Sequence, residues 1–272
     1  MTTSGPEASS DIGSSRRVAF EIRPGVRFPR WDRARSDAAE AALLTIFGAV
    51  DVERRWVGYG EALDRVRTAI LRSFATTARA PSPARLAEAC GLAPDELAAV
   101  LRELKDRDLI VLDRSGDTVT GAYPFTQSDT GHVVRVDGVA LFAMCAVDAL
   151  GIGAMLGRDT KIESRCGGCG APVRAETGEG GLGLTSHAPD DAVVWVGDLY
   201  AGGCGATSLC RTILFFCSDE HLRAWRQAGC SDLDGCRLSV AEAHQVGTVI
   251  FGPMLASGIS ESGSVKGDCD DQ

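Results

Sequence analysis

The sequence lacks the features of membrane-spanning and secreted proteins. None of its 272 residues belongs to an apolar run approaching the roughly 18–20 residues that a membrane-spanning helix needs. The first fifteen residues, MTTSGPEASSDIGSS, are polar and contain no apolar segment of a secretory signal. We therefore expect a cytoplasmic protein without a membrane partner.

An excess of positive charge, an internal repeat and a phosphate-binding glycine loop are also missing. The net charge is −9, from 28 Lys and Arg against 37 Asp and Glu, so nothing in the composition suggests a polyanionic partner. The glycine-rich stretch GEGGLG at 178–183 follows no expected strand and does not predict a nucleotide site. Hydrophobic residues make up 44% of the chain, which is enough for an ordinary core.

Cysteine, by contrast, is abundant. The chain has ten cysteines, and in a cytoplasmic protein such a number indicates metal binding or catalysis rather than disulfides. Thiol chemistry is therefore the first function class to consider.

Composition and periodicity divide the chain into four parts. These are a disordered, Arg-rich arm over residues 1–36, a winged helix-turn-helix-like domain over 37–127, a core of strands and helices over 128–256, and a disordered tail over 257–272. The expected fold class is α+β. We expect the helical winged-helix-like unit to pack on a C-terminal mixed or antiparallel sheet with flanking helices.

The winged-helix prediction rests on periodic apolar residues followed by a hairpin signal. Helices are expected at 37–50, 61–76, 82–91 and 93–109, and a two-stranded wing at 109–125. A recognition helix must approach phosphates. The helix at 93–109 instead carries Asp95, Glu96, Glu103 and Asp106 against Arg102 and Lys105. DNA is therefore not an expected partner, and the unit is expected to pack on the domain that follows.

Strands and helices are expected to alternate after residue 128. The stretch 132–145 predicts a strand that runs into a helix, whereas 191–197 and 207–217 predict strands. Two more helices are expected at 218–229 and 239–255, the second with a capping box.

The stretch FAMCAVDAL at 142–150 places Cys145 three residues before Asp148 in apolar surroundings. On a helix these two side chains share one face. Burial raises the pKa of a carboxyl group, so Asp148 could hold a proton near neutral pH and deliver it. Burial also raises a thiol pKa, so Cys145 would need a soft cation to become a thiolate. Taken alone, the pair is more typical of a packed cysteine and an aspartate at a helix edge. Likewise Cys210, in the stretch TSLCRTILFF, is by itself more typical of a small core residue.

A second group of residues has the spacing of zinc ligands. Cys166 and Cys169 form a knuckle in RCGGCGAP, and Cys217 and His221 stand four apart in FFCSDEH. Three cysteines and one histidine are an ordinary structural zinc set, although about 48 residues between the halves is a long spacing. A thioredoxin-like redox motif is the weaker alternative, because the surrounding glycines do not favour the helix that such a motif opens.

The combination of these motifs resembles the organomercurial (alkylmercury) lyases. The stretch VDGVALFAMCAVDALGIGAMLGRDTKIESRCGGCGAPV is similar to their catalytic core, which has a Cys-Ala-x-Asp helix, a Leu/Gly/Arg turn, a strand ending in cysteine and a Gly-Ala-Pro turn. Here these are Cys145–Asp148, Leu156–Arg158, Cys166 and Gly170–Pro172. The stretch SLCRTILFFCS resembles the strand that holds the family's second active cysteine, which would be Cys210, and SVAEAHQVG resembles the final helix. The resemblance covers about residues 60–255.

This resemblance implies an enzyme that splits a carbon–mercury bond by protonolysis, giving a hydrocarbon and Hg(II). Cys145 and Cys210 would hold mercury, and Asp148 would deliver the proton to carbon. The reaction would require no cofactor, and Hg(II) would be present as the bound product. A thiol or a mercuric reductase would accept Hg(II) from the enzyme.

Three departures from the family pattern keep an alternative open. The first 40 residues or so match nothing in the family, and Cys169 and Cys217 each replace a small residue. With His221 these changes coincide with the zinc-like quartet. The chain is then either a lyase with an added structural zinc, or a non-catalytic metal-binding or metal-sensing winged-helix protein.

Overall fold

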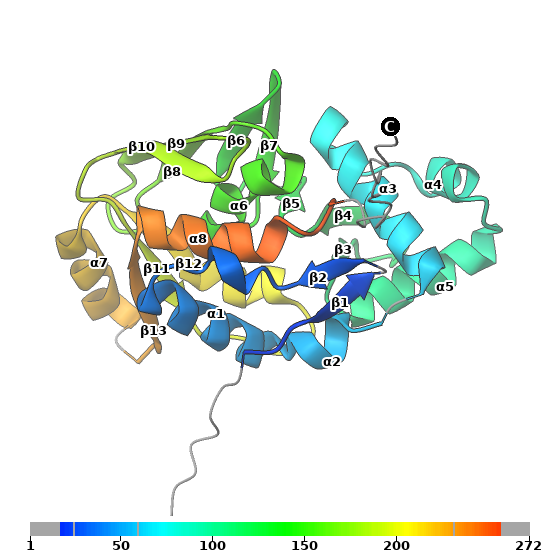
Figure 1. Ribbon diagram of the computed structural model, residues 1–272, viewed down its shortest axis with the longest axis horizontal. Helices are drawn as coiled ribbons and strands as arrows, with labels where there is room; N and C mark the ends of the chain where they lie inside the picture. The colour runs from blue at the N-terminus through cyan, green and yellow to red at the C-terminus, as the bar shows by residue number, and fades with distance from the viewer. Residues whose placement is uncertain (1–16, 24, 59, 231, 257–272) are drawn as a thin grey trace, which may run out of the picture.

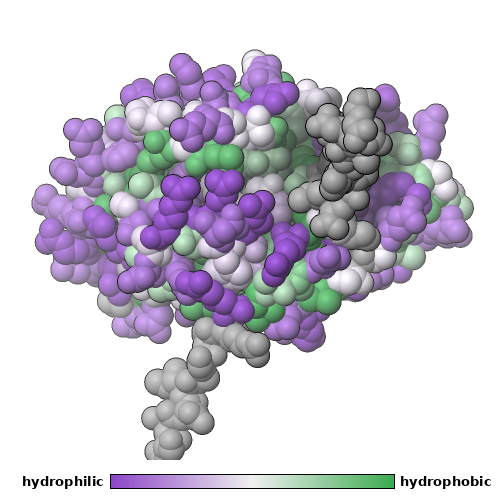
Figure 2. Space-filling model, viewed as in Figure 1, coloured by the Kyte–Doolittle hydropathy of each residue, from purple (hydrophilic) through white to green (hydrophobic). Residues whose placement is uncertain are grey.

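The computed structural model describes residues 17–23, 25–58, 60–230 and 232–256. Within these residues the fold is α+β, as predicted from the sequence, with N-terminal helices beside an eight-stranded antiparallel sheet and a smaller three-stranded sheet. Figure 2 shows that hydrophilic residues cover most of one face, with hydrophobic residues in smaller areas between them. In the described part of the chain, no helix has the length and apolarity to cross a membrane.

The prediction of a disordered arm is wrong for residues 17–23 and 25–36, whereas residues 1–16 lie outside the described residues, as does the tail predicted at 257–272. Strands β1 (Phe20–Arg23) and β2 (Val26–Phe28) form an antiparallel hairpin, followed by the short helix η1 (Trp31–Arg33). Ile22 and Phe28 are buried. Apolar residues spaced between the arginines therefore give the segment a core-facing side that its overall composition hides.

Helices fill the next part of the chain. They are α1 (Asp37–Val50), α2 (Val52–Trp56), α3 (Glu61–Thr77), α4 (Pro83–Cys90) and α5 (Pro94–Asp106). Ser82 caps α4, and Gly91 ends that helix with a positive φ of 63°. Strands β3 (Ile110–Leu112) and β4 (Val119–Ala122) pair antiparallel where the wing is predicted, and α3, α4 and α5 lie at the right of Figure 1.

The wing is part of the main sheet. The eight strands follow the order β10-β9-β8-β6-β7-β5-β4-β3, and every neighbouring pair is antiparallel. This sheet runs through the domain boundary predicted at residue 127, since β5 pairs with β4 on one side and β7 on the other. The remaining strands are β5 (Phe125–Thr126), β6 (Val133–Val136), β7 (Val139–Ala143), β8 (Lys161–Arg165), β9 (Pro172–Gly178) and β10 (Gly183–Ala188).

The stretch 132–145 is a hairpin rather than a strand running into a helix. Val136 pairs with Val139, so β6 and β7 are joined by the two residues Asp137 and Gly138, which have φ of 48° and 82°. Asp-Gly is the residue pair that a tight hairpin with positive φ at both central positions favours. Helix α6 (Ala146–Leu156) therefore begins only after β7.

The three-stranded sheet has the order β12-β11-β13. Its strands are β11 (Val193–Gly197), β12 (Ile213–Phe216) and β13 (Gly235–Ser239), and they are accompanied by α7 (Asp219–Trp225), the π-helical turn η4 (Arg226–Cys230) and α8 (Val240–Phe251). The capping box of Ser239 and Glu242 at the start of α8 is confirmed.

Helices α6 and α8 pack closely at the centre of the molecule. A Cβ atom on Gly151 would lie 2.7 Å from the carbonyl oxygen of Gly247, so glycine at this crossing allows the two backbones to meet. Helix α8, orange in Figure 1, also contacts α1. The start of α6 is thereby held between the main sheet and the helical layer.

Candidate active site

The structure brings together Cys145, Asp148 and Cys210. One ligand atom from each residue lies within 4.8 Å of the other two, and the Cys210 thiol points at Asp148 Oδ2 with a separation of 3.8 Å. The exposed fractions of the three residues are 2%, 4% and 6%. Two sulfurs can hold one ion between them when they lie up to about 4.6 Å apart, which is twice the metal–sulfur distance of zinc sites.

Cys145 is the N-cap of α6, not a residue within the helix as predicted. The reason is that β7 pairs with β5 and β6 up to Ala143, so the sheet holds the preceding residues extended. The backbone N–H of Asp148 donates to Cys145 Sγ at 3.4 Å. A thiolate at this position would face the unpaired N–H groups and the positive end of the helix dipole.

Cys210 lies in the 3₁₀ turn η3 (Leu209–Thr212), which corrects the prediction that it lies in a strand. Pairing of β12 with β11 begins only at Ile213, opposite Val196. Strand β11 ends at Gly197, short of Leu199, which this register would place opposite Cys210, and a glycine-rich loop with η2 (Gly205–Thr207) leads into the turn. In this turn the Cys210 side chain points toward α6, where its sulfur lies 3.8 Å from Asp148 Oδ2.

Burial shifts all three ionisations toward the neutral forms. It raises the pKa of Asp148 to about 7, although hydrogen bonds from Cys145 and Cys210 lower it in part. Burial also raises the pKa of the Cys145 thiol. The pKa of Cys210 lies well above its ordinary value because of its hydrogen bond with Cys145 and its burial. The resting site therefore contains protonated thiols beside a carboxyl group that titrates near neutrality.

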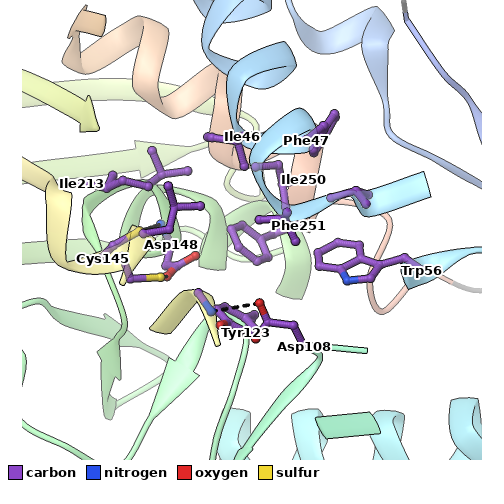
Figure 3. Close-up of a pocket in the computed structure, with 16 residues that line it drawn as sticks. Ile46, Phe47, Trp56, Asp108, Tyr123, Cys145, Asp148, Ile213, Ile250 and Phe251 are labelled. Atoms are coloured by element: carbon purple, nitrogen blue, oxygen red, sulfur yellow. Dashed lines mark hydrogen bonds between the residues drawn. The ribbon is translucent and has the colours of Figure 1, made fainter. Parts of the chain in front are cut away.

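All three residues line an apolar pocket, and Figure 3 shows Cys145 and Asp148 on one side of it and Trp56 across from them. Its apolar lining comes from α1, α2, α6, α8 and the segment around η3. These residues are Ile46, Phe47, Val50, Val52, Trp56, Val147, Leu209, Ile213, Ile250 and Phe251. The contribution of α1 and α2 was not predicted, because their apolar residues give the same sequence signal as core residues.

Asp108 is a buried acid that the sequence analysis missed. Its Oδ1 accepts a hydrogen bond from the Tyr123 hydroxyl at 3.0 Å, and its Oδ2 accepts from the Tyr200 hydroxyl at 3.0 Å and the Gly205 N–H at 2.9 Å. Burial raises the pKa of Asp108, and these hydrogen bonds oppose the rise. Asp108 and Tyr123 line the pocket together in Figure 3. The network ties the loop that precedes Cys210 to the start of the wing.

Cys210 also borders a second hollow, whose lining is partly polar and partly apolar. Its lining includes Ser128, Asp129, Thr130, His132, Thr207 and Arg211. Cys210 therefore lines both an apolar pocket, which it shares with Cys145 and Asp148, and this second hollow, which contains more polar residues.

The predicted quartet of Cys166, Cys169, Cys217 and His221 also converges. Its four ligand atoms lie within 4.8 Å of one another. The Cys169 and Cys217 sulfurs are 3.6 Å apart, and Cys217 Sγ lies 2.6 Å from His221 Nδ1. Cys166 is buried, Cys169 is exposed, and the other two are half-buried.

The quartet also stabilises a thiolate. Burial opposes ionisation of Cys166, but backbone N–H groups of Cys217, Cys169 and Gly168 point at its sulfur and lower its pKa to about 7. Burial and the neighbouring thiols raise the pKa of Cys217 to about 12. Such N–H groups around a sulfur favour the charged form that binds a metal.

Comparisons with known proteins agree on one family. The alkylmercury lyase (MerB) family matches residues 125–252. An alkylmercury lyase of Streptomyces lividans is 31% identical over 171 residues, which cover 63% of this chain and 75% of that protein. One from Bacillus cereus is 28% identical over 186 residues, covering 68% and 78%. The mercury-bound form of MerB2 has the same fold, with a TM-score of 0.64 and 22% identity over 81% of this chain and 100% of that one.

Proposed function

The chain belongs to the alkylmercury lyase family, and from this premise we propose that it splits the carbon–mercury bond of organomercurial compounds by protonolysis. The observation that supports this most is the convergence of two thiols and a carboxyl group within 4.8 Å in the lining of an apolar pocket. The site combines ligands for a soft metal with a proton donor, and it excludes water from both.

The apolar pocket receives the organic group, and the two cysteines receive mercury. Mercury is a soft cation that prefers thiolates to carboxylates and imidazole. Cys145 is the better first ligand, because the N–H groups at the start of α6 stabilise its thiolate. It displaces the anion X⁻ from R–Hg–X, and its proton leaves with that anion to solvent.

The second thiol proton is the one that reaches carbon. Cys210 transfers it to Asp148 Oδ2, 3.8 Å away, and bonds mercury as the second thiolate. Asp148 then protonates the carbon, which takes up the electron pair of the carbon–mercury bond. The hydrocarbon R–H leaves, and Hg(II) remains on Cys145 and Cys210. A carboxyl group with a pKa of about 7 can accept and release a proton at neutral pH.

Release of Hg(II) requires an acceptor with thiols of its own. A small-molecule thiol or a mercuric reductase would exchange with the two cysteines, one sulfur at a time. The second hollow beside Cys210 gives such an acceptor a route of approach other than the apolar pocket.

The activity can be tested with phenylmercury and an excess of a small thiol, with benzene as the measured product. We expect benzene from the protein and none from its Cys145→Ala variant. Benzene no higher than in that control would overturn the proposal. Mercury retained by the protein without benzene would instead favour the non-catalytic metal-binding alternative.

A further inference from the structure

The quartet joins two segments that are 48 residues apart. Cys166 and Cys169 lie on the knuckle between β8 and β9, and Cys217 and His221 lie where β12 passes into α7. These elements lie toward the left of Figure 1. Because the ligand atoms come from both segments, an ion bound there would join the main sheet to the three-stranded sheet.

The distances suit a tetrahedral ion of the size of zinc. Zinc–sulfur bonds of about 2.3 Å and zinc–nitrogen bonds of about 2.0–2.1 Å place neighbouring ligand atoms roughly 3.4–3.8 Å apart. The Cys169–Cys217 separation of 3.6 Å lies in this range. The Cys217–His221 separation of 2.6 Å would open by about 1 Å around an ion.

The backbone around the quartet is shaped to bring the segments together. The N–H of Gly167 donates to the Phe215 carbonyl at 2.8 Å, which attaches the knuckle to β12. A Cβ atom on Gly168 would lie 2.9 Å from the His221 carbonyl oxygen, so glycine permits the knuckle to approach α7. Gly170 has a positive φ of 74° and closes the knuckle by donating its N–H to the Cys166 carbonyl at 2.9 Å.

We propose that this chain holds one structural Zn²⁺ through the Sγ atoms of Cys166, Cys169 and Cys217 and the Nδ1 atom of His221. Four protein ligands fill a tetrahedral shell and leave no open position, so the ion has no part in the bond cleavage. The proposal does not depend on the lyase activity, because the quartet shares no residue with the Cys145, Asp148 and Cys210 site.

Such an ion would act on the candidate active site through β12. Cys210 comes shortly before this strand and Cys217 directly after it. Zinc would fix the far end of β12 against the knuckle, and binding of this kind adds to folding free energy.

Metal analysis of the full-length protein, purified without chelator, tests the site directly. We expect about one zinc per chain in the wild type and close to none in Cys169→Ser and His221→Ala. Cys236→Ser is the matched control, because this half-buried cysteine on β13 lies outside both clusters, and it should keep its zinc. Cys145→Ala should keep it as well, which separates this outcome from that of the benzene assay.

Cobalt provides a second readout. After exchange of the bound metal for Co²⁺, a tetrahedral thiolate site gives strong visible absorption, which should be absent in Cys169→Ser. Circular dichroism checks that the variants are folded, and replacing exposed Cys169 leaves no cavity in the core. Wild-type protein without stoichiometric zinc, iron in its place, or folded ligand variants that retain zinc would each overturn the proposal.

Discussion

The two cysteine clusters take residues from opposite ends of β12, with Cys210 shortly before the strand and Cys217 directly after it, and they use thiols in different surroundings. Cys145 and Cys210 are buried beside a carboxyl group and an apolar pocket. Cys169 is exposed, and its cluster adds an imidazole and backbone N–H groups. The first cluster can give a metal two sulfurs and a proton donor, whereas the second can fill a tetrahedral shell.

This difference indicates how one chain can handle two soft or borderline metals. A metal that enters with an organic group and leaves again needs an incomplete shell, and cleavage of the carbon–metal bond needs an acid nearby to protonate that group. A metal that stays needs a complete shell and nothing to protonate. The first site offers two thiols and a carboxyl group, and the second offers three thiols and an imidazole. The ligands that accompany the cysteines therefore distinguish the two sites better than the presence of cysteine does.

The largest expected effect is that of removing one thiol from the buried cluster. Cys145→Ala should reduce benzene formation from phenylmercury to the background level, because one remaining sulfur cannot activate the carbon–mercury bond. Cys90→Ala is the matched control, since Cys90 is equally buried but lies in α4. A Cys145→Ala variant with substantial activity would remove the distinction between the clusters. Gas chromatography of benzene measures the activity of both variants.

The next largest effect is expected from the acid. Asp148→Asn keeps the shape of the side chain but supplies no transferable proton, so protonolysis should slow by roughly 10²–10⁴-fold. Mercury binding should persist, because both sulfurs remain. Single-turnover measurement of benzene, with mercury content determined on the same sample, separates the two steps. Equal losses of binding and turnover would mean that Asp148 acts on the metal and not on carbon.

Local sequence signals predicted much of this molecule. Ser82, Gly91 and the Ser239–Glu242 capping box end or start their helices as expected, because caps depend on neighbouring residues. Each half of the quartet was recognisable in the same way, since its ligands are three or four residues apart. The pairing of the two halves followed from ligand chemistry rather than from the fold.

Features that depend on distant pairing were harder to predict. Cys145 is an N-cap because β7 pairs with β5 and β6, and the Asp137–Gly138 signal for that hairpin could have been used. Cys210 lies in a turn because β11 ends at Gly197, short of Leu199, which this register would place opposite Cys210. Asp108 showed no signal, since its partners Tyr123 and Tyr200 are 15 and 92 residues away.

Burial of Asp148 should make the stability of the protein depend on pH. The Asp148 pKa is about 3.9 in an unfolded chain and about 7 in the fold. Between these values the folded protein holds a proton that the unfolded chain releases, so this group lowers the free energy of unfolding as pH rises from 4 to 7. Asp148→Asn should therefore gain stability over the wild type across this range, by up to about 4 kcal/mol above pH 7.

Chemical denaturation at several pH values measures this difference. His132 has a pKa lowered to about 4 by burial, which changes stability in the opposite direction, but it is present in both proteins and cancels in the comparison. A difference between the two proteins that stays constant with pH would show that Asp148 titrates as an ordinary exposed carboxyl group.

The smallest expected effect concerns what holds the buried cysteines in place. The proposed zinc would position the quartet. The loop before Cys210 is instead held by hydrogen bonds from Tyr200 and Gly205 to Asp108. In Asp108→Asn one of the accepting oxygens becomes an NH₂ group that cannot accept from Tyr123 or from Tyr200 and Gly205. A lost buried hydrogen bond costs about 1–3 kcal/mol, partly offset by removing a buried charge.

We expect Asp108→Asn to lower kcat for protonolysis by about tenfold, as a cost near 1.4 kcal/mol in positioning Cys210 would, and to leave zinc content unchanged. Tyr200→Phe removes only one hydroxyl of the same network and should have a smaller effect in the same direction. Cys169→Ser should show the reverse pattern, with zinc lost and kcat less affected. If Asp108→Asn instead released zinc, the two clusters would share one support, and the contrast between a site positioned by metal and one positioned by hydrogen bonds would fail.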